Sequence, residues 1–255
     1  MGVAPLNETA SEVRKRLLAD ERDLTAAADG DLAYWRSVAA ETTGSIVEIG
    51  SGGGRILTTL GTVDRQLIGI DLDAAALALA AERAPLVEWI CADGRVWRRE
   101  GCAAGLVVLG GDLLSLVTTA ADLEALLRTA ALLCAPDGLV GIDATHMDPQ
   151  VFAEEIGGKW GIDLERPDAE FGHVRRESRI TPDPQSRTNT VRLEIRHRVV
   201  GADGSLTAIY PDRAPFAIRA WQPEEVRAVA AAVGLRVVRV GADDRLRWLL
   251  RSVDE

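Results

Sequence analysis

The sequence predicts an α/β fold: a mostly parallel, seven-stranded sheet with an antiparallel last strand, and an antiparallel β layer inserted into it. From residue 46 to about 145, short apolar runs that end at a turn or a polar residue alternate with stretches of helical periodicity. The alternation returns after residue 220 and closes with two apolar runs that are too near in sequence for a parallel crossover. Between these regions, apolar and polar residues alternate with the period of a strand that has one solvated face.

The first part of the core is expected to contain several strands separated by helices. The strands are residues 46–50, 67–71, 87–93, 105–110 and 139–143. One helix is expected to begin at about Arg55, and two further helices are expected over residues 73–84 and 122–134. In the last helix, apolar side chains at helical spacing form one stripe that faces the sheet, namely Leu123, Leu126, Leu127 and Ala130. Pro136-Asp137-Gly138 is expected to end this helix before the next strand. Such alternation implies right-handed crossovers and parallel pairing.

A helix and a pair of strands are expected to complete the core. Pro223 suits the first turn of the helix and Gly234 suits its C-terminus. The apolar stripe of this helix consists of Val226, Val229, Ala230 and Val233. Residues 236–240 and 245–250 follow as strands, and the few residues between them force antiparallel pairing.

Three regions are therefore expected along the chain. They are an N-terminal helical cap over residues 1–42, the α/β core over residues 43–150 and 221–255, and the inserted layer over residues 151–220. Within the layer, residues 191–200 alternate between apolar and polar side chains. After the turn signal Ala202-Asp203-Gly204, residues 205–210 return as their antiparallel partner.

Composition and charge favour a small-molecule partner. The chain has 255 residues and a net charge of −10, with a pI near 4.9, so its long-range field repels a nucleic-acid backbone. No run reaches the roughly 18 apolar residues of a membrane span, and the first residues lack the apolar segment of a signal peptide. Cys91, Cys102 and Cys134 have no C-x-x-C spacing, which argues against a zinc site and a disulfide framework. We expect a soluble, cytoplasmic protein with no nucleic-acid or membrane partner; a homodimer is left open.

The stretch IVEIGSGGGR, residues 46–55, places a glycine-rich turn directly after a buried strand. A phosphate-binding P-loop would require a Lys followed by Ser or Thr, but Arg55 and Ile56 stand there. A dinucleotide-binding turn would require glycine in place of Arg55, so a nicotinamide-binding oxidoreductase is the weaker alternative. The third pattern, an acid followed by glycines at alternate positions, is matched in full by Glu48, Gly50, Gly52 and Gly54.

This pattern, with the residues that follow it, resembles the class I S-adenosylmethionine-dependent methyltransferases over residues 46–145 and 221–252. The resemblance implies a Rossmann-like core that binds S-adenosylmethionine and whose closing antiparallel strands distinguish it from the all-parallel dehydrogenases. Glu48 matches the acid that engages the methionine end of the cofactor, and the three glycines match the turn that the cofactor approaches.

The same resemblance implies how the adenosine end is bound. Asp71 matches the acid whose two carboxylate oxygens accept both ribose hydroxyls. Asp93 matches the acid after the third strand that accepts from the adenine amine, and Leu72 and Gly94 adjoin these two acids. Leu109 ends the fourth strand, where the family places the reacting methyl group.

Methyl transfer from a sulfonium is an in-line displacement, so the site must align the acceptor, exclude water and remove a proton where needed. Asp112 and His146 are the candidate proton acceptors, because they follow the fourth and fifth strands. For His146, capping of the following turn is an equally good interpretation. Where the family often carries Asn-Ser or Ser-Ser, this chain has Asp112 and Ser115, and an anionic Asp112 suits an amine or a cation.

The inserted layer loosely resembles the cover of the glycine, sarcosine and sugar-amine N-methyltransferases, which implies that residues 151–220 cover a small substrate. Arginines are frequent over residues 172–200 and suit an anionic substrate. However, Arg192, Arg196 and Arg198 share the outward phase of one strand, which favours a solvated face. The aromatic residues that could wall an acceptor are interpreted mostly as packing residues: Trp35, Trp160, Trp221 and Tyr210.

The leading hypothesis is an S-adenosylmethionine-dependent methyltransferase that acts on a nitrogen or an oxygen of a small molecule. Two alternatives stay open. One is the nicotinamide-binding oxidoreductase, and the other is a non-catalytic partner subunit that binds S-adenosylmethionine.

Overall fold

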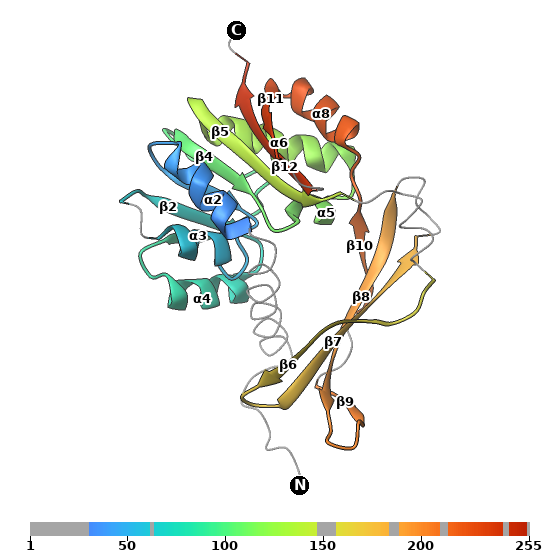
Figure 1. Cartoon of the computed structure of the whole chain (residues 1–255). Coiled ribbons are helices and arrows are strands. Elements are labelled where there is room, and N and C mark those ends of the chain that lie inside the picture. Colours follow the sequence, from blue (N-terminus) through green and yellow to red (C-terminus); the bar gives the residue numbers. More distant parts are fainter. Residues whose placement is uncertain are drawn as a thin grey trace. The chain divides into compact units, whose positions relative to one another are not determined.

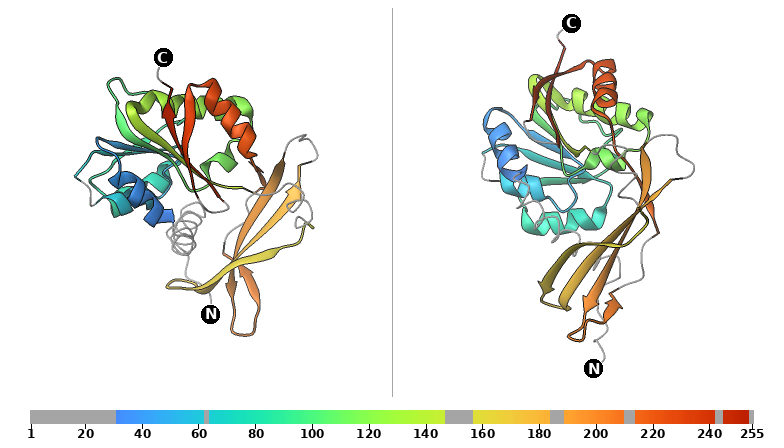
Figure 2. Two further views of the ribbon diagram at one scale, coloured as in Figure 1. Left: turned by 45° about the horizontal axis from the view of Figure 1, so that its top comes forward. Right: turned by 45° about the vertical axis from the view of Figure 1, so that its right-hand side comes forward.

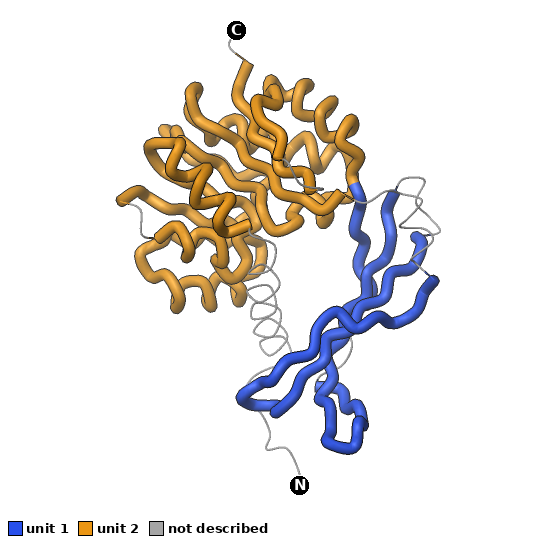
Figure 3. The backbone as a smooth tube through the Cα atoms, in the orientation of Figure 1, with its two compact units in different colours: residues 1–14, 147–220 blue, residues 15–146, 221–255 orange. Residues whose placement is uncertain are grey.

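The computed structural model describes residues 31–61, 64–146, 157–183, 189–209, 214–241 and 245–253. Contacts divide them into two compact units, which Figure 3 shows in different colours. The larger unit contains the described residues from 31 to 146 and from 221 to 253, and the smaller unit contains those from 157 to 220. Most of the helical cap expected over residues 1–42 lies outside the described residues, which begin at Asp31.

The larger unit is built on a seven-stranded sheet (Figure 1). Its strands are β1 (Ile46–Ile49), β2 (Leu67–Asp71), β3 (Glu88–Cys91), β4 (Ala104–Leu109), β5 (Cys134–Thr145), β11 (Leu235–Val240) and β12 (Arg245–Ser252). Their spatial order is β11-β12-β5-β4-β1-β2-β3. All neighbours from β5 to β3 are parallel, whereas β12 is antiparallel to both β5 and β11. The predicted Rossmann-like sheet with an antiparallel last strand is confirmed.

Helices cover both faces of this sheet (Figure 2). They are α2 (Asp31–Ala40), α3 (Arg55–Leu60), α4 (Ala74–Arg83), α5 (Leu113–Leu116), α6 (Ala120–Leu133) and α8 (Pro223–Ala232). On one face, α6 and α8 pack against a cluster that includes Val47 of β1. On the other face, α2 and α3 pack against a cluster that includes Ile46. The stripe predicted for α6 is confirmed, because all its members are buried: Leu123, Leu126, Leu127 and Ala130.

The boundary between α6 and β5 differs from the expectation. The helix ends at Leu133 and the strand begins at once, so Pro136-Asp137-Gly138 lies inside β5 rather than in a turn before it. Ala104 of β4 pairs with Cys134, while Leu106 already pairs with Leu139, so the segment between them is a bulge. A proline is tolerated in a strand where the hydrogen-bond ladder is interrupted in this way. The single turn of α5 is a further element that the sequence pattern does not predict.

The smaller unit is an antiparallel sheet, as predicted for the insertion. Its strands are β6 (Gly161–Asp168), β7 (Gly172–Pro182), β8 (Thr190–Val200), β9 (Leu206–Ala208) and β10 (Phe216–Arg219). The main order is β10-β8-β7-β6, and β9 also pairs with β8. Each of these pairs is antiparallel, which confirms the predicted return of the chain onto β8.

Arginines of this sheet are ion-paired across neighbouring strands. Arg179 pairs with Glu194 at 2.7 Å, and Arg196 pairs with Glu177 at 2.5 Å. The Arg196 guanidinium also lies 3.8 Å from the centroid of the Trp160 ring. The prediction of a plain solvated face is therefore wrong for Arg196, whose charge is balanced within the sheet. The same pairing gives no support to the idea that these two arginines recruit an anionic substrate.

Candidate functional site

The carboxyl ends of β1 to β5 meet at one edge of the larger sheet, because these strands are parallel neighbours. Open α/β sheets bind ligands at this edge. The residues predicted for the site all lie in or directly after these strands: Glu48, Gly50, Gly52, Gly54, Asp71, Leu72, Asp93, Gly94, Leu109, Asp112 and His146. The fold thus brings to one edge residues that are nearly one hundred positions apart in sequence.

The turn after β1 has a backbone that glycine adopts with little strain. Gly50, Gly52 and Gly54 have φ angles of 75°, 51° and 76°. Space is limited as well: a Cβ on Gly54 would lie 2.5 Å from the Trp89 ring, and one on Gly50 would lie 2.6 Å from the Leu113 side chain. The absence of side chains in this turn therefore follows from both its conformation and its packing.

Asp71, the last residue of β2, holds the glycine turn in place. Its Oδ2 accepts a hydrogen bond from the Gly52 N–H at 2.7 Å, and its Oδ1 accepts one from the Asp73 N–H at 2.8 Å. Asp73 in turn caps α4 by accepting from two amides of the first helical turn. A carboxylate has about four acceptor positions, so both oxygens of Asp71 keep capacity for a further donor. The sequence pattern does not predict that Asp71 also supports the turn.

Glu48 is a buried acid beside this turn and is only 3% exposed. Burial raises the pKa of Glu48 to about 8, although the nearby Arg55 guanidinium and a hydrogen bond from the Leu57 amide lower it. Its Oε2 is buried and has no hydrogen-bond partner among the described residues, and the same holds for Oγ of Ser51 in the turn itself. Two unsatisfied polar groups beside a bare turn fit a polar ligand such as the amino-acid end of S-adenosylmethionine.

Arg55 stands where a dinucleotide-binding turn would have its third glycine. Its guanidinium forms a two-pronged ion pair with Asp31 at the start of α2, with N–O distances of 2.9 and 2.5 Å. The two side chains are only 15% and 6% exposed. Arg55 therefore joins α2 to α3, and its charge also faces Glu48.

Asp93 follows β3 and is engaged by Arg95. The guanidinium donates to Oδ1 at 3.0 Å and to Oδ2 at 2.7 Å, and these hydrogen bonds lower the pKa of Asp93. Gly94 is required by packing, since a Cβ there would overlap the side chain of Ile49. Leu72 is 67% exposed and presents an apolar side chain next to Asp71.

Leu109 and Asp112 lie at the end of β4 in different settings. Leu109 is fully buried in the core, so only its backbone is available at the site. Asp112 has a φ of 61° and is the one non-glycine residue in the described part of the chain with a positive φ. Its Oδ1 accepts hydrogen bonds from the Thr145 N–H and, at 3.2 Å, from the Arg245 guanidinium. Asp112 thus connects the carboxyl ends of β4 and β5 with the start of β12.

His146 follows β5 and is the neighbour of Thr145, so Asp112 and His146 lie near one another at this edge. Nδ1 of His146 is buried without a hydrogen-bond partner among the described residues. The residues that a capping His146 would serve, 147–156, lie outside the described part of the chain. Both interpretations of this histidine remain predictions.

Three charged residues at the same edge were not predicted from the sequence. Asp143 of β5 is 1% exposed, and burial raises its pKa. Arg245 donates to its Oδ1 at 2.6 Å, and Arg247 lies 3.5 Å from the same oxygen. Because Arg245 also reaches Asp112, β12 contributes directly to the site. The signals that could have identified the cluster are an aspartate that closes the apolar run LVGID and two arginines that flank Leu246.

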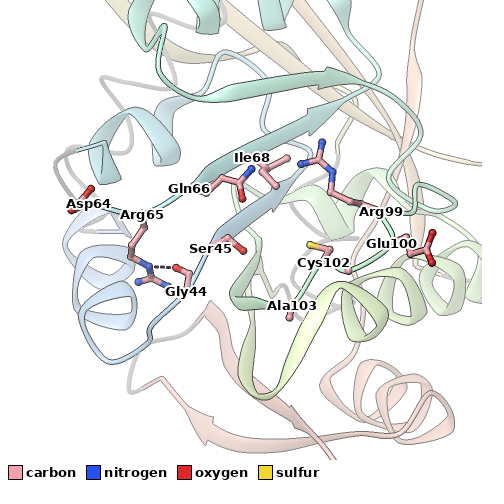
Figure 4. Close-up of a pocket in the computed structure, with 11 residues that line it drawn as sticks. Gly44, Ser45, Asp64, Arg65, Gln66, Ile68, Arg99, Glu100, Cys102 and Ala103 are labelled. Carbon is pink, nitrogen blue, oxygen red and sulfur yellow. Dashed lines mark hydrogen bonds between the residues drawn. The ribbon is translucent and has the colours of Figure 1, made fainter.

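A cavity lies at the opposite, amino-terminal edge of the sheet (Figure 4). It measures about 440 Å³ and is lined by residues that precede β1, β2 and β4, including Ser45, Gln66 and Ala103. Arg65, which also lines it, donates to the carbonyl oxygens of Ala39, Thr42, Thr43 and Gly44 and so fixes the segment after α2. This cavity is remote from the glycine turn, and we place the functional site at the carboxyl edge.

The described residues contain no group of three or more His, Cys, Asp or Glu side chains arranged to hold a metal ion. None of the helices among these residues combines the length and the apolar character that crossing a bilayer requires.

Comparison with known proteins agrees with this geometry. Residues 46–138 match the family model of a methyltransferase domain. No curated protein sequence matches the chain significantly.

Three solved structures are similar to this chain over most of its length. DesVI from Streptomyces venezuelae is 22% identical with a TM-score of 0.72, and the match covers 96% of this chain and 98% of that one. CalS10, an amino pentose methyltransferase from Micromonospora echinaspora solved with S-adenosylmethionine bound, is 25% identical with a TM-score of 0.69 and coverages of 96% and 97%. The sugar N-methyltransferase KedS8 from a Streptoalloteichus species is 19% identical with a TM-score of 0.72 and coverages of 100% and 98%.

The family match runs from β1 into β5 and includes the glycine turn, Asp71 and Asp93. The solved structures extend the similarity of fold to nearly the whole chain. Residues 46–138 therefore form a methyltransferase domain, built on the fold of the S-adenosylmethionine-dependent methyltransferases.

Proposed function

We propose that this chain uses S-adenosylmethionine to methylate a nitrogen or an oxygen of a small molecule. The observation that carries the proposal is the bare glycine turn, which Asp71 holds and which adjoins Oε2 of Glu48, a buried oxygen with no hydrogen-bond partner in the described part of the chain. The ammonium group of a methionine moiety can donate a hydrogen bond to this oxygen. A cation beside Glu48 would also favour the charged carboxylate that burial disfavours.

The cofactor supplies a methyl group that its sulfonium has already activated, so the protein's tasks are to bind, align and manage one proton. We assign the remaining acceptor capacity of Asp71 to the ribose hydroxyls. Asp93 is assigned to the adenine amine, with the exposed side chain of Leu72 as an apolar neighbour of the adenosine.

Asp112 and His146 are proposed to face the methyl acceptor. Oδ1 of Asp112 is engaged by Thr145 and Arg245, while Oδ2 has no hydrogen-bond partner among the described residues. Oδ2 can therefore accept an N–H or O–H of the acceptor and direct the acceptor's lone pair toward the methyl group. Nδ1 of His146, which is also unpartnered among these residues, is proposed to take the released proton.

An amine is the acceptor class that we favour. An anionic Asp112 stabilises the ammonium that forms when an amine nitrogen takes up a methyl group. Two of the similar structures, CalS10 and KedS8, are described as methyltransferases of an amino pentose and of a sugar nitrogen. We extend that class to this chain and assign the inserted sheet, within residues 151–220, as a cover for the acceptor. A cytoplasmic location, the absence of a nucleic-acid partner, and homodimer formation are further proposals.

The test is transfer of labelled methyl from S-adenosylmethionine to a panel of amino sugars, each paired with the sugar that carries a hydroxyl at the same position. We expect product with the amines and a large loss of turnover in Asp112→Asn. Tight binding of S-adenosylhomocysteine without product from any member of the panel would instead favour the non-catalytic partner subunit. Binding of NAD in place of S-adenosylhomocysteine would favour the oxidoreductase.

A further inference from the structure

The loop after β3, residues 93–98, is fastened to helix α6 at two points. Nη1 of Arg95 donates to Oδ1 of Asp122 at 2.5 Å, and Oγ1 of Thr129 donates to the carbonyl oxygen of Arg95 at 2.7 Å. Asp122 and Thr129 are about two turns apart, so they lie on the same face of α6. The backbone and the side chain of Arg95 are therefore both fixed by a rigid element.

Arg95 also holds the carboxylate of Asp93. Oδ1 accepts from the Arg95 N–H at 2.9 Å and from Nε at 3.0 Å. Oδ2 accepts from Nη2 at 2.7 Å and less closely from Nε at 3.2 Å. The single Nε N–H is shared between the two oxygens and lies closer to Oδ1, so Oδ2 accepts one full hydrogen bond and the weaker share of a second and keeps more acceptor capacity than Oδ1.

We infer that Arg95 is a positioning residue for recognition of the adenine base: it orients Asp93 so that Oδ2 faces the exocyclic amine. The inference rests on the proposed function, because it concerns the adenosine end of that cofactor. Hypoxanthine carries a carbonyl oxygen where adenine carries the amine, so a fixed carboxylate at this place accepts from adenine and opposes hypoxanthine. A carboxylate that rotates freely discriminates less. Arg95 and Asp122 thus contribute to base selectivity without contact with the base.

The partial exposure of the ion-paired side chains argues against a role of Arg95 in folding stability alone. The side chains of Arg95, Asp93 and Asp122 are 41%, 27% and 37% exposed. Ion pairs of that exposure contribute little to folding stability. Removal of Arg95 should therefore leave the protein folded, and its effect should be confined to the site.

The test uses isothermal titration of the full chain with S-adenosylhomocysteine and with S-inosylhomocysteine, its hypoxanthine counterpart. The variants are Arg95→Met, Arg95→Lys and the control Arg128→Met. Arg128 lies on the same helix and forms an ion pair of similar exposure with Glu124, away from the loop. The ratio of the two affinities is the readout, because a general loss of structure lowers both affinities together.

We expect the wild type to favour the adenine ligand and Arg95→Met to lose about tenfold of that preference, the effect of one charge-assisted hydrogen bond. Arg95→Lys should keep part of the preference, since it retains the charge but not the two-pronged geometry. Arg128→Met should match the wild type. An unchanged ratio in Arg95→Met, or an equal loss for both ligands, would overturn the inference. Failure of the wild type to bind S-adenosylhomocysteine would instead refute the proposed function.

Discussion

The carboxylate of Asp71 bridges two backbone amides: Oδ2 accepts from Gly52 at 2.7 Å and Oδ1 accepts from Asp73 at 2.8 Å. One side chain at the end of β2 thus fixes both the glycine turn after β1 and the start of α4. The acid assigned to the ribose is therefore also part of the framework that shapes the site.

Asp71→Asn should weaken both functions. An asparagine amide offers one oxygen acceptor, so either the Gly52 or the Asp73 amide loses its partner, at a cost of about 1–2 kcal/mol in the free energy of unfolding. Affinity for S-adenosylhomocysteine should fall at least about tenfold. Chemical denaturation and isothermal titration measure the two effects. Asp73→Asn is the matched control, because asparagine caps a helix as well as aspartate does. Wild-type affinity in Asp71→Asn would contradict the assignment.

Gly54→Ala should destabilise the protein more than a comparable change at an open glycine. Gly54 has a φ of 76°, and an added Cβ would lie 2.5 Å from the Trp89 ring. The left-handed strain costs about 1–2 kcal/mol, and overpacking adds about 1–3 kcal/mol. Gly234 has a similar φ of 77° with no atom within 4 Å of an added Cβ, so Gly234→Ala should show the strain alone. Urea denaturation of both variants checks this, and equal losses would mean that the turn tolerates a side chain.

Glu48 predicts a specific dependence of stability on pH. Its pKa is about 8 in the folded chain, raised from 4.5 chiefly by burial, so the folded state binds a proton more tightly than the unfolded state does. The contribution of Glu48 to stability is therefore fully present below pH 4.5 and is lost as pH rises toward about 8. The difference in unfolding free energy between the wild type and Glu48→Gln, measured over this range, isolates it. We expect the difference to shift in favour of Glu48→Gln as pH rises; a constant difference would exclude a raised pKa.

Arg245→Met should reveal how much the charge cluster at the start of β12 contributes to stability. The change removes the 2.6 Å partner of Asp143, which is 1% exposed, and also one partner of Asp112. Loss of a buried partner costs about 3–5 kcal/mol, and Arg247 at 3.5 Å offsets part of it. Thermal denaturation measures the effect. Arg239→Met, which breaks the exposed pair with Glu41, should change little. If both variants lose the same stability, the cluster has no special role.

Much of the larger unit could be predicted because its signals are local. Apolar stripes such as Leu123, Leu126 and Leu127 of α6 report burial directly, and the turn after β1 is a contiguous motif. The inserted sheet is harder to predict from the sequence. Strand β6 lies at the edge of its sheet and is largely exposed, and its alternation is limited to Ile162 and Leu164, which is much shorter than the alternation in β8.

The charge network of the site depends on pairs that are remote in sequence. Arg245 and Asp112 are 133 positions apart, and their hydrogen bond follows from the antiparallel pairing of β12 with β5. Similarly, the role of Arg95 depends on Asp122 of α6. Residue types alone identified the acids, but the partners that orient them are set by the tertiary fold.

The most direct measurement is isothermal titration of the wild-type chain with S-adenosylhomocysteine and with NAD, followed by the same titration of Asp71→Ala. We predict micromolar binding of S-adenosylhomocysteine at one site per chain, no binding of NAD, and a clear loss of affinity in Asp71→Ala. Binding of NAD alone, or an affinity for S-adenosylhomocysteine that is unchanged in Asp71→Ala, would contradict the proposed site.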